Sequence, residues 1–158
     1  MATQLAIYLR NHEAAARAGY ELFRRASASQ RRRPYGAELS ELAGEVAEDL
    51  SSLQLVLRAN GVQPDLVLAT ALRIGERVGR LKPNGRILTR APLSDLIEVE
   101  GLLNAVHAKG SGWQALKAAG AAVHDGGLDF DGLFERAEDQ RSRLARLHAT
   151  VAARVLSG

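Results

Sequence analysis

The sequence predicts an all-α protein, a four-helix bundle, on the evidence of its composition and of the spacing of its apolar residues. Alanine and leucine supply 27 and 24 of the 158 residues, whereas valine, isoleucine and threonine together supply 18, a balance that favours helix over sheet. Apolar residues recur three and four positions apart in four long segments, as on one face of a helix. This length is typical of one domain, so we assign residues 1–158 to a single helical domain.

The first two helices are predicted over residues 3–28 and 37–59. The first apolar stripe ends at a serine-containing segment, three arginines and Pro34. The second ends at Asn60 and Gly61, where glycine can adopt the left-handed backbone that closes a helix. About eight residues separate the two helices, and so short a connection requires antiparallel neighbours.

Three further helices are predicted: a short one over 64–80 and long ones over 92–119 and 130–157. Pro64 suits the first turn of the short helix, and an aspartate at 129 or 131 can cap the last helix. About thirty-two residues separate the second long helix from the third. That connection can run back along a helix of about 37 Å, so we expect these two helices to be parallel, joined by one long crossover.

Three glycines lie inside the predicted third long helix. Gly101, Gly110 and Gly112 each cost about 1 kcal/mol relative to alanine in a helix. They predict either close contact with a neighbouring helix or a break. We favour a kink near 110–112 with Trp113 packed beside it.

Four long helices with a single long crossover resemble the ferritin-like superfamily. The stretches 8–12, 47–49, 79–86 and 97–102 look like those of an uncharacterised bacterial branch of small helical proteins. The resemblance implies a bundle core in which carboxylates and Glu-x-x-His pairs hold two metal ions.

The chain departs from that di-iron pattern. Its nearest matches, Glu45-x-x-Glu48 and Glu135-x-x-Glu138, end in glutamate where the family has histidine. Because the Glu-x-x-His pairs are missing, we expect neither ferroxidase nor oxidase activity.

Each long helix carries a polar residue where its stripe calls for an apolar one: His12, Asp49, Glu100 (with His107 as a second residue on that helix), and Gln140 or Arg141. Buried ionised groups are costly unless they are paired or bound to a metal, so we expect these side chains to converge.

Two interpretations of this cluster remain open. One is an altered metal site for iron or manganese, with His12, Asp49 and Glu100 as ligands and Glu138 as a further one. The other, which we favour, is a buried hydrogen-bond and ion-pair network that fixes the register of the bundle. In that network His12 would pair with Asp49, and Glu100 with Arg141.

Charge and composition limit the classes of partner and the cellular compartment that we expect for this protein. The net charge of +3 is small, but arginines and a lysine concentrate in residues 24–33 and 73–90. The absence of cysteine excludes disulfides and thiolate catalysis and indicates a reducing, cytoplasmic compartment. No apolar run approaches the ~20 residues needed to span a membrane.

The sequence therefore predicts a non-catalytic ferritin-like bundle that self-associates as a homodimer and whose polar core is either structural or a reduced metal site. The alternative is a basic adaptor that binds nucleic acid or an acidic protein through 24–33 and 73–90.

Overall fold

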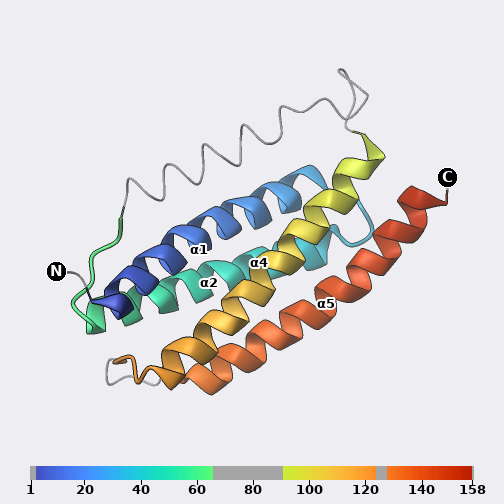
Figure 1. Cartoon of the computed structure of the whole chain (residues 1–158). Helices are drawn as coiled ribbons and strands as arrows, with labels where there is room; N and C mark the ends of the chain where they lie inside the picture. Colours follow the sequence, from blue (N-terminus) through green and yellow to red (C-terminus); the bar gives the residue numbers. More distant parts are fainter. Residues whose placement is uncertain (1–2, 66–90, 124–127, 158) are drawn as a thin grey trace.

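A computed structural model describes residues 3–65, 91–123 and 128–157 of the chain. These residues form helices and no strand, which confirms the all-α class (Figure 1). The helices are α1 (Gln4–Ser29), α2 (Gly36–Ala59), α4 (Pro92–Ala118) and α5 (Phe130–Leu156). Each end lies within one residue of its prediction, whereas the helix predicted over 64–80 falls almost wholly outside the described residues.

Local signals fix the ends of these helices. The Thr3 hydroxyl accepts a hydrogen bond from the Ala6 amide at the start of α1 (3.1 Å), and Asp129 accepts two amide bonds at the start of α5. Gly61 and Gly120 follow α2 and α4 with positive φ angles of 65° and 62°. Such angles favour glycine and end a helix, as the sequence predicts for Gly61.

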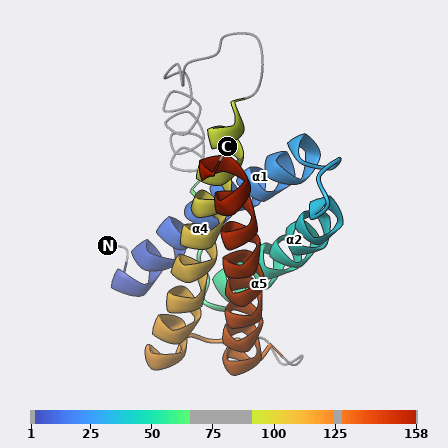
Figure 2. The ribbon, with the colours of Figure 1, turned by 90° about the vertical axis from the view of Figure 1, so that its right-hand side faces the viewer.

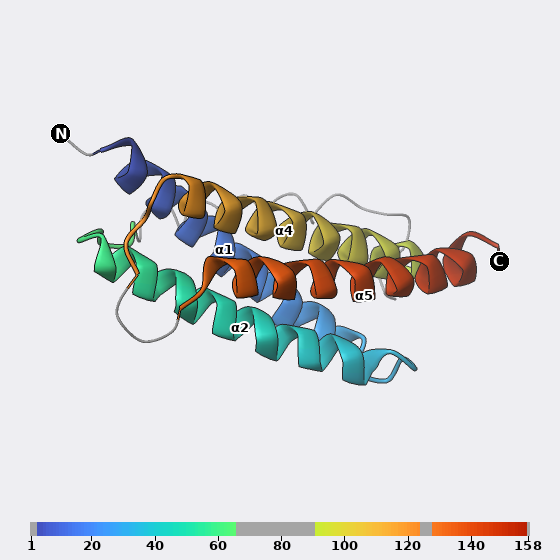
Figure 3. The same ribbon diagram turned by 90° about the horizontal axis from the view of Figure 1, so that it is seen from below.

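The helices form two antiparallel hairpins, α1–α2 and α4–α5, which cross at an angle when the molecule is viewed from the right-hand side of Figure 1 (Figure 2). The predicted parallel arrangement of α2 and α4 is observed, because both run in the same direction along the bundle (Figure 1). At the end of these two helices, Asn60 Nδ2 donates to the Ala122 carbonyl (2.9 Å) and Asn60 Oδ1 accepts from the Ala122 amide (3.1 Å). Seen from below, α5 lies beside α4 and next to α2 (Figure 3).

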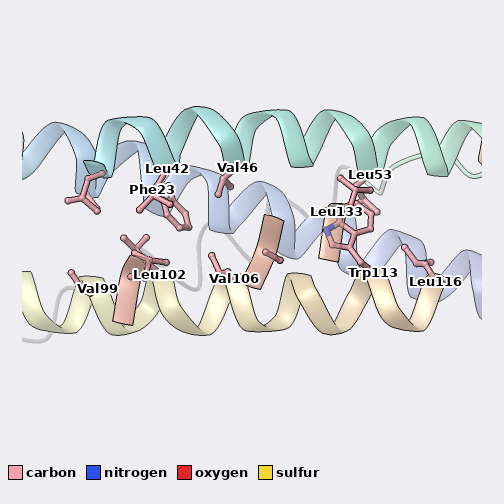
Figure 4. Close-up of a cluster of buried hydrophobic side chains, with 14 of the residues drawn as sticks. Phe23, Leu42, Val46, Leu53, Val99, Leu102, Val106, Trp113, Leu116 and Leu133 are labelled. Carbon is pink, nitrogen blue, oxygen red and sulfur yellow. The ribbon is translucent and has the colours of Figure 1, made fainter. Parts of the chain in front are cut away.

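The apolar core takes buried side chains from all four helices. Leu42, Val46 and Leu53 of α2 point toward α4, and Phe23 of α1 lies between the two helices (Figure 4). The buried face of α4 opposite them consists of Leu96, Val99, Leu102, Val106, Gly110, Trp113 and Leu116. The apolar stripe predicted for α2 is confirmed, Asp49 included, since all six positions from Leu39 to Val56 at heptad spacing are buried.

The buried face of α4 differs from the predicted one by about one position. The sequence places residues 93, 96, 100, 103 and 107 inside, yet Leu93, Glu100 and His107 are exposed. One residue on a helix is a rotation of about 100°. Apolar residues on several sides of α4, including the exposed Ile97, make its periodicity ambiguous. The prediction that Glu100 and His107 face the core is therefore wrong.

The glycines of α4 mark close helix contacts. The predicted kink is wrong, because α4 runs unbroken from Pro92 to Ala118 and without a sharp bend (Figure 3). A Cβ atom at Gly112 would lie 3.0 Å from Nδ1 of His12, and one at Gly101 would lie 3.1 Å from a methyl group of Leu22. A Cβ at Gly110 would meet Ala137 of α5 at 3.6 Å. These glycines let α1 and α5 approach α4.

Within the described residues, no helix combines the length and the apolar character needed to cross a bilayer.

We expect Gly44→Ala in α2 and Gly112→Ala in α4 to have different effects on stability. A Cβ at Gly44 has no atom within 4 Å, so alanine there should raise the free energy of unfolding by about 0.5–1 kcal/mol through helix propensity alone. At Gly112 the His12 ring must move, which should remove that gain. Urea unfolding measures both. Equal stabilisation by the two substitutions would show that His12 does not lie against α4.

Candidate functional site

A buried carboxylate joins three helices in the middle of the bundle. Asp49 of α2 is 2% exposed and accepts hydrogen bonds on both oxygens. Lys109 Nζ of α4 donates to Oδ2, and Arg136 Nη2 of α5 donates to Oδ1. Gln140 Nε2 of α5 donates to the same Oδ2 at 3.2 Å. The charge of Asp49 is thus neutralised and its oxygens are satisfied, as a buried carboxylate requires.

The contacts continue along the interface of α2 and α5. Gln140 Oε1 accepts from Lys109 Nζ, and its Nε2 also donates to Glu45 Oε2 at 2.9 Å. Arg143 Nη1 donates to Glu45 Oε1 at 2.6 Å, and its Nη2 donates to Glu41 at 2.8 Å. We call Glu45, Asp49, Lys109, Arg136, Gln140 and Arg143 the central polar network. It joins α2 to α5 through long polar side chains.

The pKa values of Lys109 and Glu45, two members of this network, both lie below their ordinary values. Burial lowers the pKa of Lys109 from its ordinary value, and the neighbouring Asp49 offsets that effect only in part. Burial also raises the pKa of Glu45, but hydrogen bonds from Arg143 and Gln140 outweigh it, so the net shift is downward. The Glu45 carboxylate is therefore held in its charged form.

His12 lies on α1 next to this network without joining it. Its ring packs on Tyr8, with ring centroids 4.2 Å apart, and lies against Gly112 of α4. Burial lowers the pKa of His12, which favours the neutral imidazole. Among the described residues, no hydrogen bond or ion pair links His12 to Asp49. The predicted His12–Asp49 pair is therefore wrong.

The structure brings together only part of the predicted cluster. Asp49 and Gln140 are buried and bonded to each other, as expected. Glu100 lies on the surface, 3.3 Å from His148, and Glu138 pairs with Arg141 at 2.8 Å on the exposed side of α5. The predicted Glu100–Arg141 pair is accordingly wrong.

The ligand set predicted for iron or manganese is not assembled. His12, Asp49, Glu100 and Glu138 do not converge, because α4 is rotated away from its predicted orientation and Glu138 faces outward. Across the described part of the chain, no three or more His, Cys, Asp or Glu side chains are grouped so as to hold a metal ion.

Sequence reasoning missed Lys109 and Arg136, the cations that neutralise Asp49. Lys109 falls on the heptad series 95, 99, 102, 106, 109, 113 and 116, which is the buried side of α4. The buried Trp113, the only tryptophan in the chain, carried the signal for this series. Arg136 gives no such signal, because its position on α5 is half-buried.

Among the described residues, two further buried carboxylates lie outside the network. Glu13 of α1 is fully buried, with Arg17 Nε 2.5 Å from one of its oxygens. Asp95 at the start of α4 accepts hydrogen bonds from Arg33 (2.9 Å) and Arg154 (2.8 Å). The Asp95 cluster ties the α1–α2 connection and the end of α5 to α4.

A pocket of about 130 Å³ lies between α1, α2 and α4, beside the central polar network. Small residues of the two facing helices line one side of it: Ala15, Ala16 and Gly19 of α1, and Ala105, Ala108 and Gly112 of α4. The pocket opens to solvent here, since Ala15 and Ala108 are exposed.

The rest of the pocket lining is mostly apolar. Phe23, Val46, Leu53 and Trp113 are among the residues that enclose it, and Figure 4 shows how these side chains converge between α2 and α4. The polar lining residues are His12, Asp49 and Lys109. The pocket is therefore mainly apolar, and the Asp49–Lys109 ion pair forms part of its wall.

Comparisons with protein-family models, with curated proteins and with solved structures gave no match to this chain.

We expect Asp49→Asn to destabilise the protein by about 3–5 kcal/mol, because it leaves the largely buried Lys109 ammonium and the half-buried Arg136 beside an uncharged amide. The matched change Glu138→Gln removes a carboxylate from a solvent-exposed pair and should cost less than about 1 kcal/mol. Denaturant unfolding of both variants gives the comparison. Similar costs would contradict the assignment of Asp49 as the buried anchor.

We expect the free energy of unfolding to fall as the pH is lowered through 6.5, and His12 to cause part of that fall. The pKa of His12 is lowered in the folded protein, so the unfolded chain binds more protons below 6.5 and acid favours unfolding. Unfolding measured between pH 7 and 5 should show a flatter slope in His12→Gln. An unchanged slope would mean that the imidazole is not buried.

Proposed function

We propose that the protein is a non-catalytic helical binding protein that holds one small, mainly apolar molecule in the pocket between α1, α2 and α4. The observation that carries this proposal is the pocket itself, an apolar space of about 130 Å³ with an opening to solvent. An apolar cavity of about 150 Å³ in another protein stays dry and binds benzene or xenon. The size supports a ligand of about one aromatic ring.

The polar groups beside the pocket support binding rather than catalysis. Asp49 and Lys109 bond to each other and to α5, so both side chains are held by the bundle itself. A general base or nucleophile needs freedom to exchange a proton or form a bond with its substrate. These groups instead stabilise the wall of the pocket.

The ferritin-like relationship remains a prediction, supported by the parallel course of α2 and α4. Self-association as a homodimer is likewise a proposal, for which the exposed apolar residues Leu93 and Ile97 of α4 offer a surface. A cytoplasmic location is supported by the absence of cysteine.

The adaptor alternative has less support. In segment 24–33, Arg24 pairs with Glu21 and Arg33 pairs with Asp95, which leaves Arg31 and Arg32 as exposed arginines of that segment with no ion pair shown. Segment 73–90 lies outside the described residues.

We expect benzene to bind saturably, with shifts in the NMR signals of Gly19, Gly112 and the Trp113 indole, all of which line the pocket. Ala16→Leu places a larger side chain in the lining and should weaken binding at least about tenfold. Ala18→Leu, on the same helix but outside the lining, should bind like the parent protein. Absence of saturable shifts at these three residues in the parent protein would refute the proposed function.

A further inference from the structure

The ion pair in the pocket wall has one hydrogen-bond donor without a partner among the described residues. A lysine ammonium carries three N–H donors. Lys109 uses one on Asp49 Oδ2 and one on Gln140 Oε1, and the described residues provide no partner for the third. Asp49 accepts from Lys109, Arg136 and Gln140, so both of its oxygens are engaged. This end of the pocket therefore offers a hydrogen bond to a ligand.

The charges around this point disfavour a charged ligand. Lys109 and Arg136 face Asp49, and Arg143 pairs with Glu45, which lies next to Gln140 on the same network. An anion here would meet the carboxylates of Asp49 and Glu45, and a cation would meet Lys109 and Arg136. In a buried apolar setting neither charge would be compensated, and an uncompensated charge is expensive to bury.

We infer that the molecule bound in this pocket is uncharged, about the size of one ring, and carries a single oxygen acceptor, a hydroxyl or a carbonyl, that takes a hydrogen bond from Lys109 Nζ. This inference rests on the proposed function and specifies its ligand class. The apolar part of the ligand occupies the space enclosed by Phe23, Val46 and Trp113, while Lys109 fixes its orientation.

Ligands of equal size test this inference. Ethylbenzene, benzyl alcohol and benzaldehyde have the same number of non-hydrogen atoms and differ in the terminal methyl, hydroxyl or carbonyl group. Without a partner in the pocket, the oxygen of benzyl alcohol would lose its bonds to water and weaken binding. We expect benzyl alcohol and benzaldehyde to bind at least as tightly as ethylbenzene. The charged ligands benzoate and benzylammonium should bind more weakly than benzyl alcohol and benzaldehyde.

Lys109→Met removes the donor and keeps a side chain of similar length, while Arg136 and Gln140 still bond to Asp49. The substitution should lower the affinity for benzyl alcohol, relative to that for ethylbenzene, by at least about tenfold, because a hydrogen bond from a charged donor is lost. Lys117→Met is the matched control, since Lys117 is exposed and pairs with Asp131 away from the pocket. It should leave the ratio of the two affinities unchanged.

A second readout does not require a substitution. Lys82, Lys109 and Lys117 are the lysines of the chain, so lysine-selective labelling gives a simple NMR spectrum. Benzyl alcohol should shift the Lys109 side-chain signal, whereas ethylbenzene should shift it far less and Lys117 should respond to neither. This measurement applies even if Lys109→Met does not fold.

The outcomes separate the two proposals. If none of the neutral ligands binds, the proposed function fails and this inference fails with it. If all three bind with no preference for oxygen, and the Lys109 signal stays unchanged, the pocket is an apolar binding site and only the role of Lys109 is refuted. Tighter binding of benzoate than of benzyl alcohol would also refute it, because the ligand would then be an anion.

Discussion

One buried carboxylate sets the constraint on which the rest of this structure depends. Asp49 is removed from water, and a buried charge costs several kcal/mol unless it is paired and fully hydrogen-bonded. The partners of Asp49 come from two other helices: Lys109 from α4, and Arg136 and Gln140 from α5. The Asp49 carboxylate is therefore fully hydrogen-bonded only when all three helices have the right rotation and height. Packing of leucine and alanine faces alone tolerates alternative registers. The polar network therefore selects one arrangement of the two hairpins.

The same arrangement explains the pocket. At the level of Lys109, α1 and α4 face each other with alanines and glycines, and a Cβ at Gly19 would lie 3.5 Å from that of Ala105. The helices approach through these small residues, but small side chains do not fill the space between α1, α2 and α4. The large side chains of Phe23 and Trp113 enclose the space that remains. The polar network that anchors the bundle and the candidate binding site therefore share one ion pair, that of Asp49 and Lys109.

Much of the fold follows from local chemistry and could be predicted. Thr3, Asp129, Gly61 and Gly120 act on the chain next to them, which is why helix ends predicted from the sequence agree with the structure within one residue. The buried face of α4 was misjudged because apolar residues such as Leu93 and Ile97 also occur on its exposed sides. The sequence does single out Asp49 and Gln140 as buried polar residues, because each interrupts a clear apolar stripe. Lys109 and the pocket were missed, since both depend on how helices distant in sequence rotate against one another.

A double-mutant cycle between Asp49 and Lys109 tests the central claim most directly. The free energies of unfolding of the parent protein, Asp49→Asn, Lys109→Met and the double variant give the coupling between these two side chains alone. If the buried ion pair fixes the bundle, we expect the double variant to be more stable than the sum of the single changes implies, by about 1–3 kcal/mol. Additive effects, within about 0.5 kcal/mol, would contradict the claim.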